Sequence, residues 1–173
     1  MESDELLETA EHARTAAQRK VGVTMAIFAA CLAVVTLMGH RLHTEEVVLQ
    51  TQTADGWAYY QAKNTRSQMY AADAKLAELQ GAQGTTLAAA WVDKASQEKQ
   101  QADEIRHSTE ELVRDTQTAA RRATMFDAAE VFIEVAIVLC SVSLLTGTSL
   151  FWRVSFLSTS VGVILAALGF LRH

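Results

Sequence analysis

The chain contains no proline at all, and only two cysteines and eight glycines among its 173 residues. Without proline, no helix is forced to kink or to end in its interior. The two cysteines, Cys31 and Cys140, are too few for a disulfide framework or for the paired cysteines of a zinc site. Each lies in an apolar stretch, where a free cysteine is typically a small apolar side chain. The composition therefore favours long uninterrupted helices.

Clustered positive charge and catalytic motifs are also lacking. The net charge is −5, and the basic residues are dispersed, which argues against a nucleic-acid-binding surface. No glycine-rich phosphate loop, nucleophile constellation or Cys-x-x-Cys pair occurs. We therefore expect no enzymatic activity, no cofactor and no nucleic-acid partner.

Hydrophobic residues make up 50% of the chain, and they are concentrated in three segments, residues 21–39, 128–146 and 150–171. Each segment reaches or approaches the roughly 20 apolar residues that a spanning helix needs. The leader, residues 1–20, begins acidic and is followed by no cleavage pattern. We expect an amphipathic leader helix and three transmembrane helices in a lipid bilayer. Small residues at a spacing of four favour close helix packing: Gly22, Ala26, Ala30, Ser158, Gly162 and Ala166.

The polar middle, residues 40–127, is rich in helix-favouring residues. Its one strong break is the glycine-containing cluster at 81–86. This break leaves two arms, Thr44–Gln80 and Thr85–Phe126, of about 55 and 63 Å at the helical rise. Arms of similar length joined by a tight turn predict a long antiparallel coiled-coil hairpin between the first and second transmembrane helices.

Apolar periodicity predicts the seam of this hairpin. In the first arm, the three-four spacing is kept by Ala62, Thr65, Met69, Ala72, Leu76 and Leu79. In the second arm, multiples of seven separate Trp91, Ile105, Leu112, Ala119 and Phe126, and smaller residues widen the stripe: Ala88, Val92, Ala95, Ala102, Thr109, Val113, Thr116, Ala120 and Ala123. A seam of mostly Ala and Thr is weak, because a buried methylene contributes only about 0.8 kcal/mol. We therefore expect a homo-oligomer.

Trp57, Tyr59 and Tyr60 form the aromatic concentration of the first arm. Trp and Tyr supply much of the contact energy of protein interfaces, so these residues are candidate anchors for a partner. The alternative is packing against the facing arm. Tyr59 and Tyr60 point about 100° apart on a helix, so both cannot face one partner helix.

Glu130 and Glu134 share a face of the second apolar segment. Carboxylates within a membrane are candidates for ion or proton handling. However, His40 and Arg41 end the first segment at the same level, next to Asp127 at the start of the second. The sequence favours a structural ion pair at the membrane interface over a proton path.

A metal site at this level is a weaker alternative. His40, His43, Asp127 and Glu130 combine imidazole and carboxylate groups, which suit several transition metals. Because this spacing is common by chance, we predict no metal here.

Two groups of residues resemble a bacterial membrane family catalogued as a domain of unknown function (DUF4337). The first comprises His43-Thr44-Glu45 and Leu49–Lys63 with its core Trp57-Ala58-Tyr59-Tyr60-Gln61-Ala62-Lys63. The second comprises Phe126-Asp127-x-Ala129-Glu130 and Ile137-Val138-Leu139-x-Ser141. The resemblance covers nearly the whole chain after the leader. It implies one span, a helical excursion and a two-span end, and it implies no activity.

The charge distribution bears on orientation. Arg14, Arg19 and Lys20 precede the first apolar segment, which favours a cytoplasmic N-terminus and a periplasmic hairpin. Arg41, Arg121 and Arg122 flank the base of the hairpin and favour the opposite orientation. Long loops follow the charge rule poorly, so we expect the periplasmic arrangement.

Together these patterns predict a multi-pass protein of the bacterial inner membrane with no enzymatic role. We expect a scaffold or accessory protein that self-assembles through its hairpin and membrane helices, or that docks on a larger membrane complex. The alternative function is an oligomeric ion or proton channel that uses Glu130 and Glu134.

Overall fold

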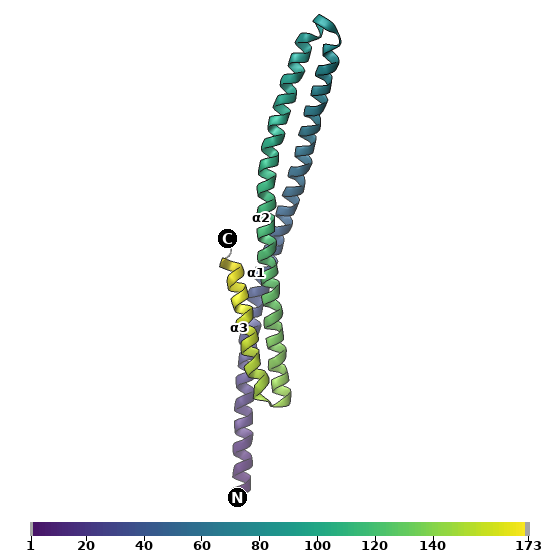
Figure 1. The fold of residues 1–173 in the computed structure, drawn as a ribbon. Coiled ribbons are helices and arrows are strands. Elements are labelled where there is room, and N and C mark those ends of the chain that lie inside the picture. The colour runs from purple at the N-terminus through teal and green to yellow at the C-terminus, as the bar shows by residue number, and fades with distance from the viewer. Residues whose placement is uncertain (1, 172–173) are drawn as a thin grey trace. The chain divides into compact units, whose positions relative to one another are not determined.

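The computed structural model describes residues 2–171, with side chains for residue 15 and residues 18–171 except 83. It contains three long α-helices, α1 (Glu2–Glu78), α2 (Thr85–Thr146) and α3 (Ser149–Leu171), and a short 3₁₀ helix, η1 (Gly81–Gln83) (Figure 1). Residues 2–171 contain no strand, so the predicted all-α class is confirmed. All three helices are long and apolar enough to cross a membrane. Most leader side chains, and with them the predicted amphipathic face, lie outside the described residues.

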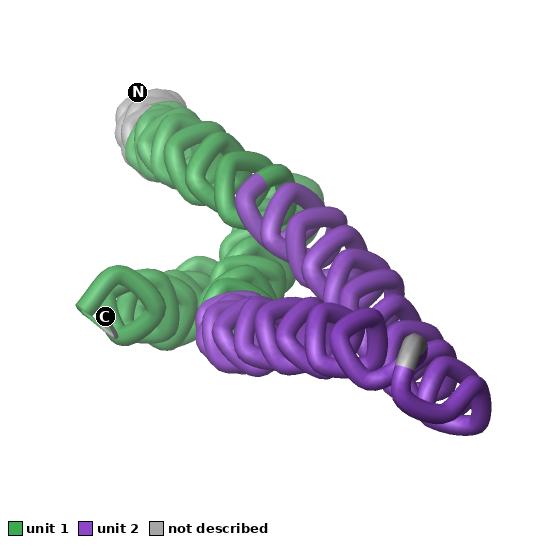
Figure 2. The backbone as a smooth tube through the Cα atoms, turned by 90° about the horizontal axis from the view of Figure 1, so that it is seen from above, with its two compact units in different colours: residues 1–44, 119–173 green, residues 45–118 purple. Residues whose placement is uncertain are grey.

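The chain divides into two compact units (Figure 2). Unit 1 comprises residues 1–44 and 119–173, and unit 2 comprises residues 45–118. The helices α1 and α2 contribute to both units, whereas α3 belongs to unit 1 alone.

Unit 1 has a core of large apolar side chains. Phe28 and Phe126 are buried, and Ile133 is completely buried. Around them α1 and α2 bring together Val21, Val35, Leu42, Ala123, Ala129, Ala136 and Cys140, and α3 adds the partly buried Trp152, Leu165 and Ala166. The ring of Phe28 meets the edge of Phe156 from α3 at a centroid distance of 5.5 Å. Large side chains therefore fill the space between the three helices of this unit.

Close contact between α2 and α3 depends on small residues of α3. A Cβ atom added to Gly162 would lie 2.9 Å from both the Ala129 carbonyl oxygen and Cγ1 of Ile133. One turn earlier, the hydroxyl of Ser158 donates to the carbonyl of Phe132 at 2.6 Å. By contrast, an added Cβ at Gly22 of α1 would meet nothing within 4 Å. The small-residue pattern of the third segment is thus packed inside unit 1.

The break between α1 and α2 falls at the glycine-containing cluster. Gly81 adopts φ 73°, a left-handed conformation in which a Cβ would be strained. The amide of Gly84 donates to the Gly81 carbonyl at 3.0 Å, and a Cβ on Gly84 would overlap the Ala77 carbonyl oxygen. Two glycines therefore permit this turn for different reasons, one for its backbone angle and one for lack of space.

In unit 2, α1 packs against α2. On the facing side of each helix, buried or half-buried residues recur at spacings of three and four. On α1 these residues are Gly56, Tyr60, Lys63, Ser67, Tyr70, Ala74 and Ala77. On α2 they are Ala88, Trp91, Ala95, Glu98, Ala102, Ile105 and Thr109. The helices approach closely, since a Cβ added to Gly56 would overlap the Thr109 hydroxyl.

The seam predicted for the first arm is wrong. Met69, Leu76 and Leu79 are 59%, 61% and 84% exposed, and the other predicted seam residues of α1, Ala62, Thr65 and Ala72, are exposed as well. Each inward residue lies two positions before a predicted one, so the inward face is on nearly the opposite side of the helix, about 160° away. Its polar side chains find partners across the pair, so an apolar pattern alone does not reveal it. On α2, Val92 also points outward and is 51% exposed.

Candidate functional site

The predicted aromatic cluster of unit 2 contains two kinds of residue. Trp57 and Tyr60 are half-buried, and their rings meet edge to face at a centroid distance of 5.7 Å. Tyr59 is 53% exposed, and the Lys63 ammonium lies 5.8 Å from the centre of its ring. Packing within the unit thus accounts for Tyr60, whereas Tyr59 presents an aromatic surface outward.

A second aromatic pair joins the two helices nearer the turn. Tyr70 of α1 stacks on Trp91 of α2 with ring centroids 5.2 Å apart. The ammonium of Lys94 lies 4.8 Å from the centre of the Trp91 ring. This arrangement places Trp91 in contact within unit 2.

Polar contacts across unit 2 replace a large apolar core. The Lys63 ammonium lies 3.1 Å from Oε2 of Glu98, and it donates to Oε1 of Gln101 at 2.5 Å. The hydroxyl of Ser67 donates to the Ala95 carbonyl at 2.8 Å. The side chains of Lys63 and Glu98 are only 11% and 18% exposed, so their charges need compensation; Nε of Arg66, 3.8 Å from Oε2 of Glu98, adds a second cation. An apolar pattern does not reveal these residues, because polar residues at inward positions cannot be told from solvent-facing ones by sequence alone.

The stripe first expected to be the seam of α1 forms an outward-facing surface, which we call the outer stripe. It consists of the predicted residues Ala62, Thr65, Met69, Ala72, Leu76 and Leu79 together with Ala58, one turn earlier, all exposed. Its members keep the three-four spacing with which one helix faces another. The helix α1 of unit 2 therefore has two faces with this spacing. The inward face packs against α2, and the outer stripe is exposed.

The outer face of α2 is different in character, because charged residues on it pair with one another. Lys99 lies 3.1 Å from Asp103, and Arg106 donates to Glu110 at 2.8 Å. The Glu110 carboxylate raises the pKa of the Arg106 guanidinium through this hydrogen bond and its charge. A face of charges already paired along the helix is typical of a solvated surface.

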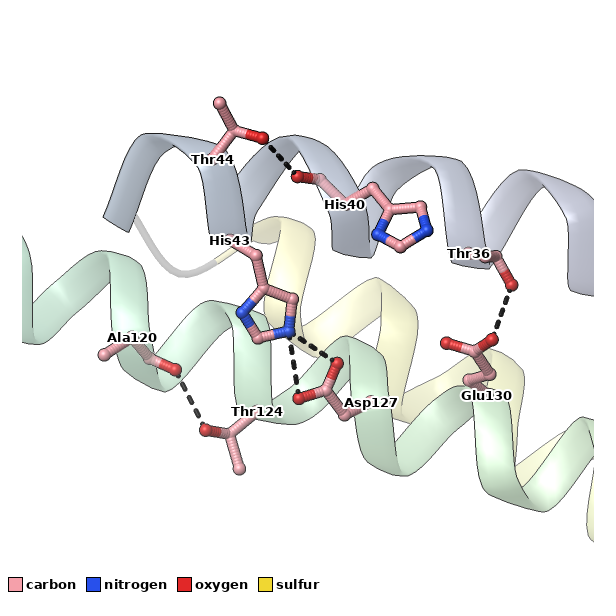
Figure 3. A network of polar contacts seen from close by, with 8 residues as sticks. All are labelled: Thr36, His40, His43, Thr44, Ala120, Thr124, Asp127 and Glu130. Carbon is pink, nitrogen blue, oxygen red and sulfur yellow. Dashed lines mark hydrogen bonds and ion pairs between the residues drawn. The ribbon is translucent and has the colours of Figure 1, made fainter. Parts of the chain in front are cut away.

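Unit 1 contains the polar cluster that the sequence places at the membrane interface (Figure 3). The hydroxyl of Thr36 donates to Oε1 of Glu130 at 2.8 Å. The Nε2 atom of His43 lies 2.9 Å from Oδ1 of Asp127. Thr36 was not among the predicted residues.

The predicted ion pair of Glu130 or Glu134 with His40 or Arg41 is not formed among the described residues. Both His40 and Arg41 are exposed, whereas Thr36 lies on the face of α1 that meets α2. The partner of Glu130 is therefore a neutral hydroxyl. Glu134 is exposed and makes no ion pair with any described side chain.

The positions of His40, His43, Asp127 and Glu130 do not support the weaker alternative of a metal site. Among the described residues, no three His, Cys, Asp or Glu side chains gather closely enough to hold a metal ion. His43 and Asp127 form a pair rather than a larger ligand set.

These features define an all-α protein with three membrane-length helices, a polar cluster in unit 1 and an outer stripe in unit 2. The family model for the domain of unknown function (DUF4337) matches residues 17–172. The chain belongs to this family. No curated protein and no solved structure matches the chain. The family supplies a shared sequence pattern without a named activity.

Proposed function

We propose that the chain is a non-enzymatic, multi-pass membrane scaffold or accessory protein that self-assembles through unit 2. In this proposal, the two helices of unit 2 form an antiparallel coiled-coil hairpin. The order of contacts supports this arrangement: Thr53 meets Thr116, Lys63 meets Glu98 and Tyr70 meets Trp91. Partner numbers on α2 fall as residue numbers on α1 rise, as expected for antiparallel helices.

The outer stripe is the observation on which self-assembly rests. Met69, Leu76 and Leu79 expose more than half of their surface, while the inward seam of the same helix contains Lys63, Ser67 and small residues. Apolar stripes of this kind are typical of helix–helix interfaces. The occupant that fits best is the outer stripe of a second copy, which has the same spacing.

Charge complementarity favours an antiparallel pairing of two copies. Arg66 and Asp73 flank the outer stripe seven residues apart, at equivalent heptad positions. An antiparallel pair centred between Met69 and Ala72 brings Arg66 opposite the partner's Asp73, twice by symmetry. Such a pair sets orientation and register more than it adds affinity.

The test is the mass of the full-length protein in detergent, measured by native mass spectrometry. We expect a discrete homo-oligomer, and we expect Met69→Gln with Leu76→Gln to shift the population toward monomer. The matched control is Val92→Gln, which changes an exposed apolar residue on the opposite helix. A monomeric wild-type chain, or a double variant with unchanged mass, would contradict the proposal. A stoichiometric second polypeptide would instead identify an accessory subunit of a larger membrane complex.

An oligomeric ion or proton channel is the second candidate function. The observation that favours it is the exposed Glu134, because an uncovered carboxylate within an apolar segment is costly in lipid. Glu130 is already bonded to Thr36, so Glu134 is the candidate for ion handling. Proteoliposomes should then show a flux that Glu134→Gln abolishes and Asp103→Asn leaves intact. Flux no greater than that of empty vesicles would exclude the channel.

We further propose the bacterial inner membrane as the location, with unit 2 on the periplasmic side. Arg19 and Lys20 directly before the first apolar segment support this orientation. The test is labelling of Leu79→Cys in intact cells by a membrane-impermeant maleimide, after Cys31 and Cys140 have been replaced by Ala. Labelling only after cell lysis would show that unit 2 lies on the cytoplasmic side.

A further inference from the structure

A cavity in unit 1 lies between the first part of α1 and the beginning of α3. It has a volume of about 530 Å³ and is lined by Arg19, Lys20, Val23, Thr24 and Trp152. Two hydrogen bonds fix its wall. Nε1 of Trp152 donates to the Thr24 hydroxyl at 3.3 Å, and that hydroxyl donates to the Lys20 carbonyl at 2.9 Å. The indole thus has a defined position beside the two basic residues.

The described side chains around the cavity carry positive charge. Arg19 and Lys20 are exposed and make no ion pair with any side chain that the structure describes. The sequence of α3 contains no acidic residue, and exposed Arg153 directly follows Trp152. Neighbouring charges of one sign add to one electrostatic potential, which extends over about 8 Å, the screening length at physiological salt. The chemistry of the cavity therefore suits an anion, above all a phosphate group.

Apolar residues beside the cavity distinguish a lipid from a free anion. Val23 and Ile27, one turn apart on α1, are 56% and 57% exposed. Phe156, one turn beyond Trp152, is 44% exposed. A phosphate at Arg19 and Lys20 would have these apolar side chains directly below it, where an acyl chain continues from a headgroup. Trp152 lies between the charged and the apolar part, the position that Trp prefers at membrane interfaces.

We propose that this cavity binds the phosphate headgroup of an anionic phospholipid, with Arg19 and Lys20 contacting the phosphate and Trp152 forming the wall. This site rests on the membrane insertion proposed above, but it is independent of self-assembly through unit 2. Basic pockets between transmembrane helices are known to bind anionic headgroups. Bound lipid would hold α1 and α3 together at this end of unit 1.

The test uses the full-length protein in detergent, titrated with phosphatidylglycerol or phosphatidylcholine and followed by native mass spectrometry. We expect preferential binding of phosphatidylglycerol. Each basic residue near an anionic surface contributes about fivefold to binding, so Arg19→Gln with Lys20→Gln should lower the affinity for phosphatidylglycerol about 30-fold. Arg114→Gln with Arg121→Gln removes two exposed charges from α2 and is the matched control. The conservative variant Lys20→Arg should retain the preference for phosphatidylglycerol.

Several outcomes would overturn the proposal. Equal binding of both lipids by the wild-type chain would show that the cavity does not select an anionic headgroup. A loss in the α2 control as large as in the Arg19 and Lys20 variant would show a general charge effect. Displacement of phosphatidylglycerol by millimolar glycerol phosphate would assign the site to a free phosphate ligand. Failure of the protein to float with liposomes would instead contradict membrane insertion itself.

Discussion

The two units of the chain pack their helices with different kinds of side chain. Unit 1 buries large side chains such as Phe28, Phe126 and Ile133. Unit 2 buries small ones such as Ala95 and Ala102, together with charged Lys63. Apolar burial contributes about 0.8 kcal/mol per methylene, so the inward seam of unit 2 gains much less from it. Unit 2 therefore depends on close approach and polar pairing, while the apolar side chains of Met69, Leu76 and Leu79 are left on the outside.

The largest effect in this comparison is expected at Lys63. Lys63→Ala leaves the mostly buried Glu98 carboxylate with only the longer contact to Nε of Arg66, 3.8 Å away, and breaking a buried pair in this way costs up to about 3 kcal/mol. Replacing both partners, as Lys63→Met with Glu98→Leu, should restore most of that stability, because no charge is then left uncompensated. Hydrogen exchange of the full-length protein over residues 45–118 is the measurement. Equal destabilisation by the single and the double variant would show that the pair is not needed to offset burial.

A smaller but well-defined effect is expected at Gly162 in unit 1. Gly162→Ala pushes a Cβ against the Ala129 backbone oxygen, and overpacking of this kind typically costs about 1–3 kcal/mol. Gly22→Ala is the matched control in α1, where an added Cβ meets nothing within 4 Å. Because Ala favours a helix over Gly by about 1 kcal/mol, this control should be neutral or stabilising. Thermal unfolding in detergent checks both, and equal midpoints would contradict the close packing of α2 and α3.

Gly56 provides the corresponding test in unit 2. Gly56→Ala should destabilise the unit by about 1–2 kcal/mol, because the new Cβ would overlap the Thr109 hydroxyl. Thr109→Ala removes the two nearest obstructing atoms and should rescue the first substitution. The measurement is hydrogen exchange around residues 56 and 109, followed for both single variants and the double variant. Additive losses without rescue would show that the two helices do not meet at this point.

The smallest effect is expected at Ser67. Ser67→Ala removes the hydrogen bond to the Ala95 carbonyl, which is worth about 1 kcal/mol. Ser96→Ala is the control, since its exposed hydroxyl bonds only to the Asp93 carbonyl of the same helix. Thermal midpoints should fall for Ser67→Ala and stay unchanged for Ser96→Ala. A lower thermal midpoint for Ser96→Ala than for Ser67→Ala would show that Ser67 does not belong to the inward seam.

Much of the fold is visible in the sequence, because its signals are local. Apolar segments of membrane length, the absence of proline and the glycines at Gly81 and Gly84 suffice for three long helices and the break between α1 and α2. The second-arm residues Trp91, Ile105 and Leu112 lie on the inward face of α2, since no competing apolar stripe occurs on that helix. These features follow from composition and periodicity alone.

The first arm could not be oriented in this way, because α1 has two stripes with the same spacing. The more apolar stripe contains Met69 and Leu76, whereas the inward one contains Lys63 and Ser67. The choice between them depends on partners far away in the sequence, such as Glu98. The same limit applies in unit 1, where the spacing of Glu130 and His40 gives no sign that Thr36 is the actual partner.

Cysteine cross-linking across the outer stripe tests self-assembly through unit 2 most directly. In a chain with Cys31 and Cys140 replaced by Ala, Met69→Cys and Ala72→Cys proteins are mixed in detergent and oxidised. We expect rapid disulfide formation between the two variants, faster than within either alone, and none for Lys99→Cys on the charged face of α2. Absence of cross-linking at the outer stripe, or equal cross-linking at position 99, would contradict it.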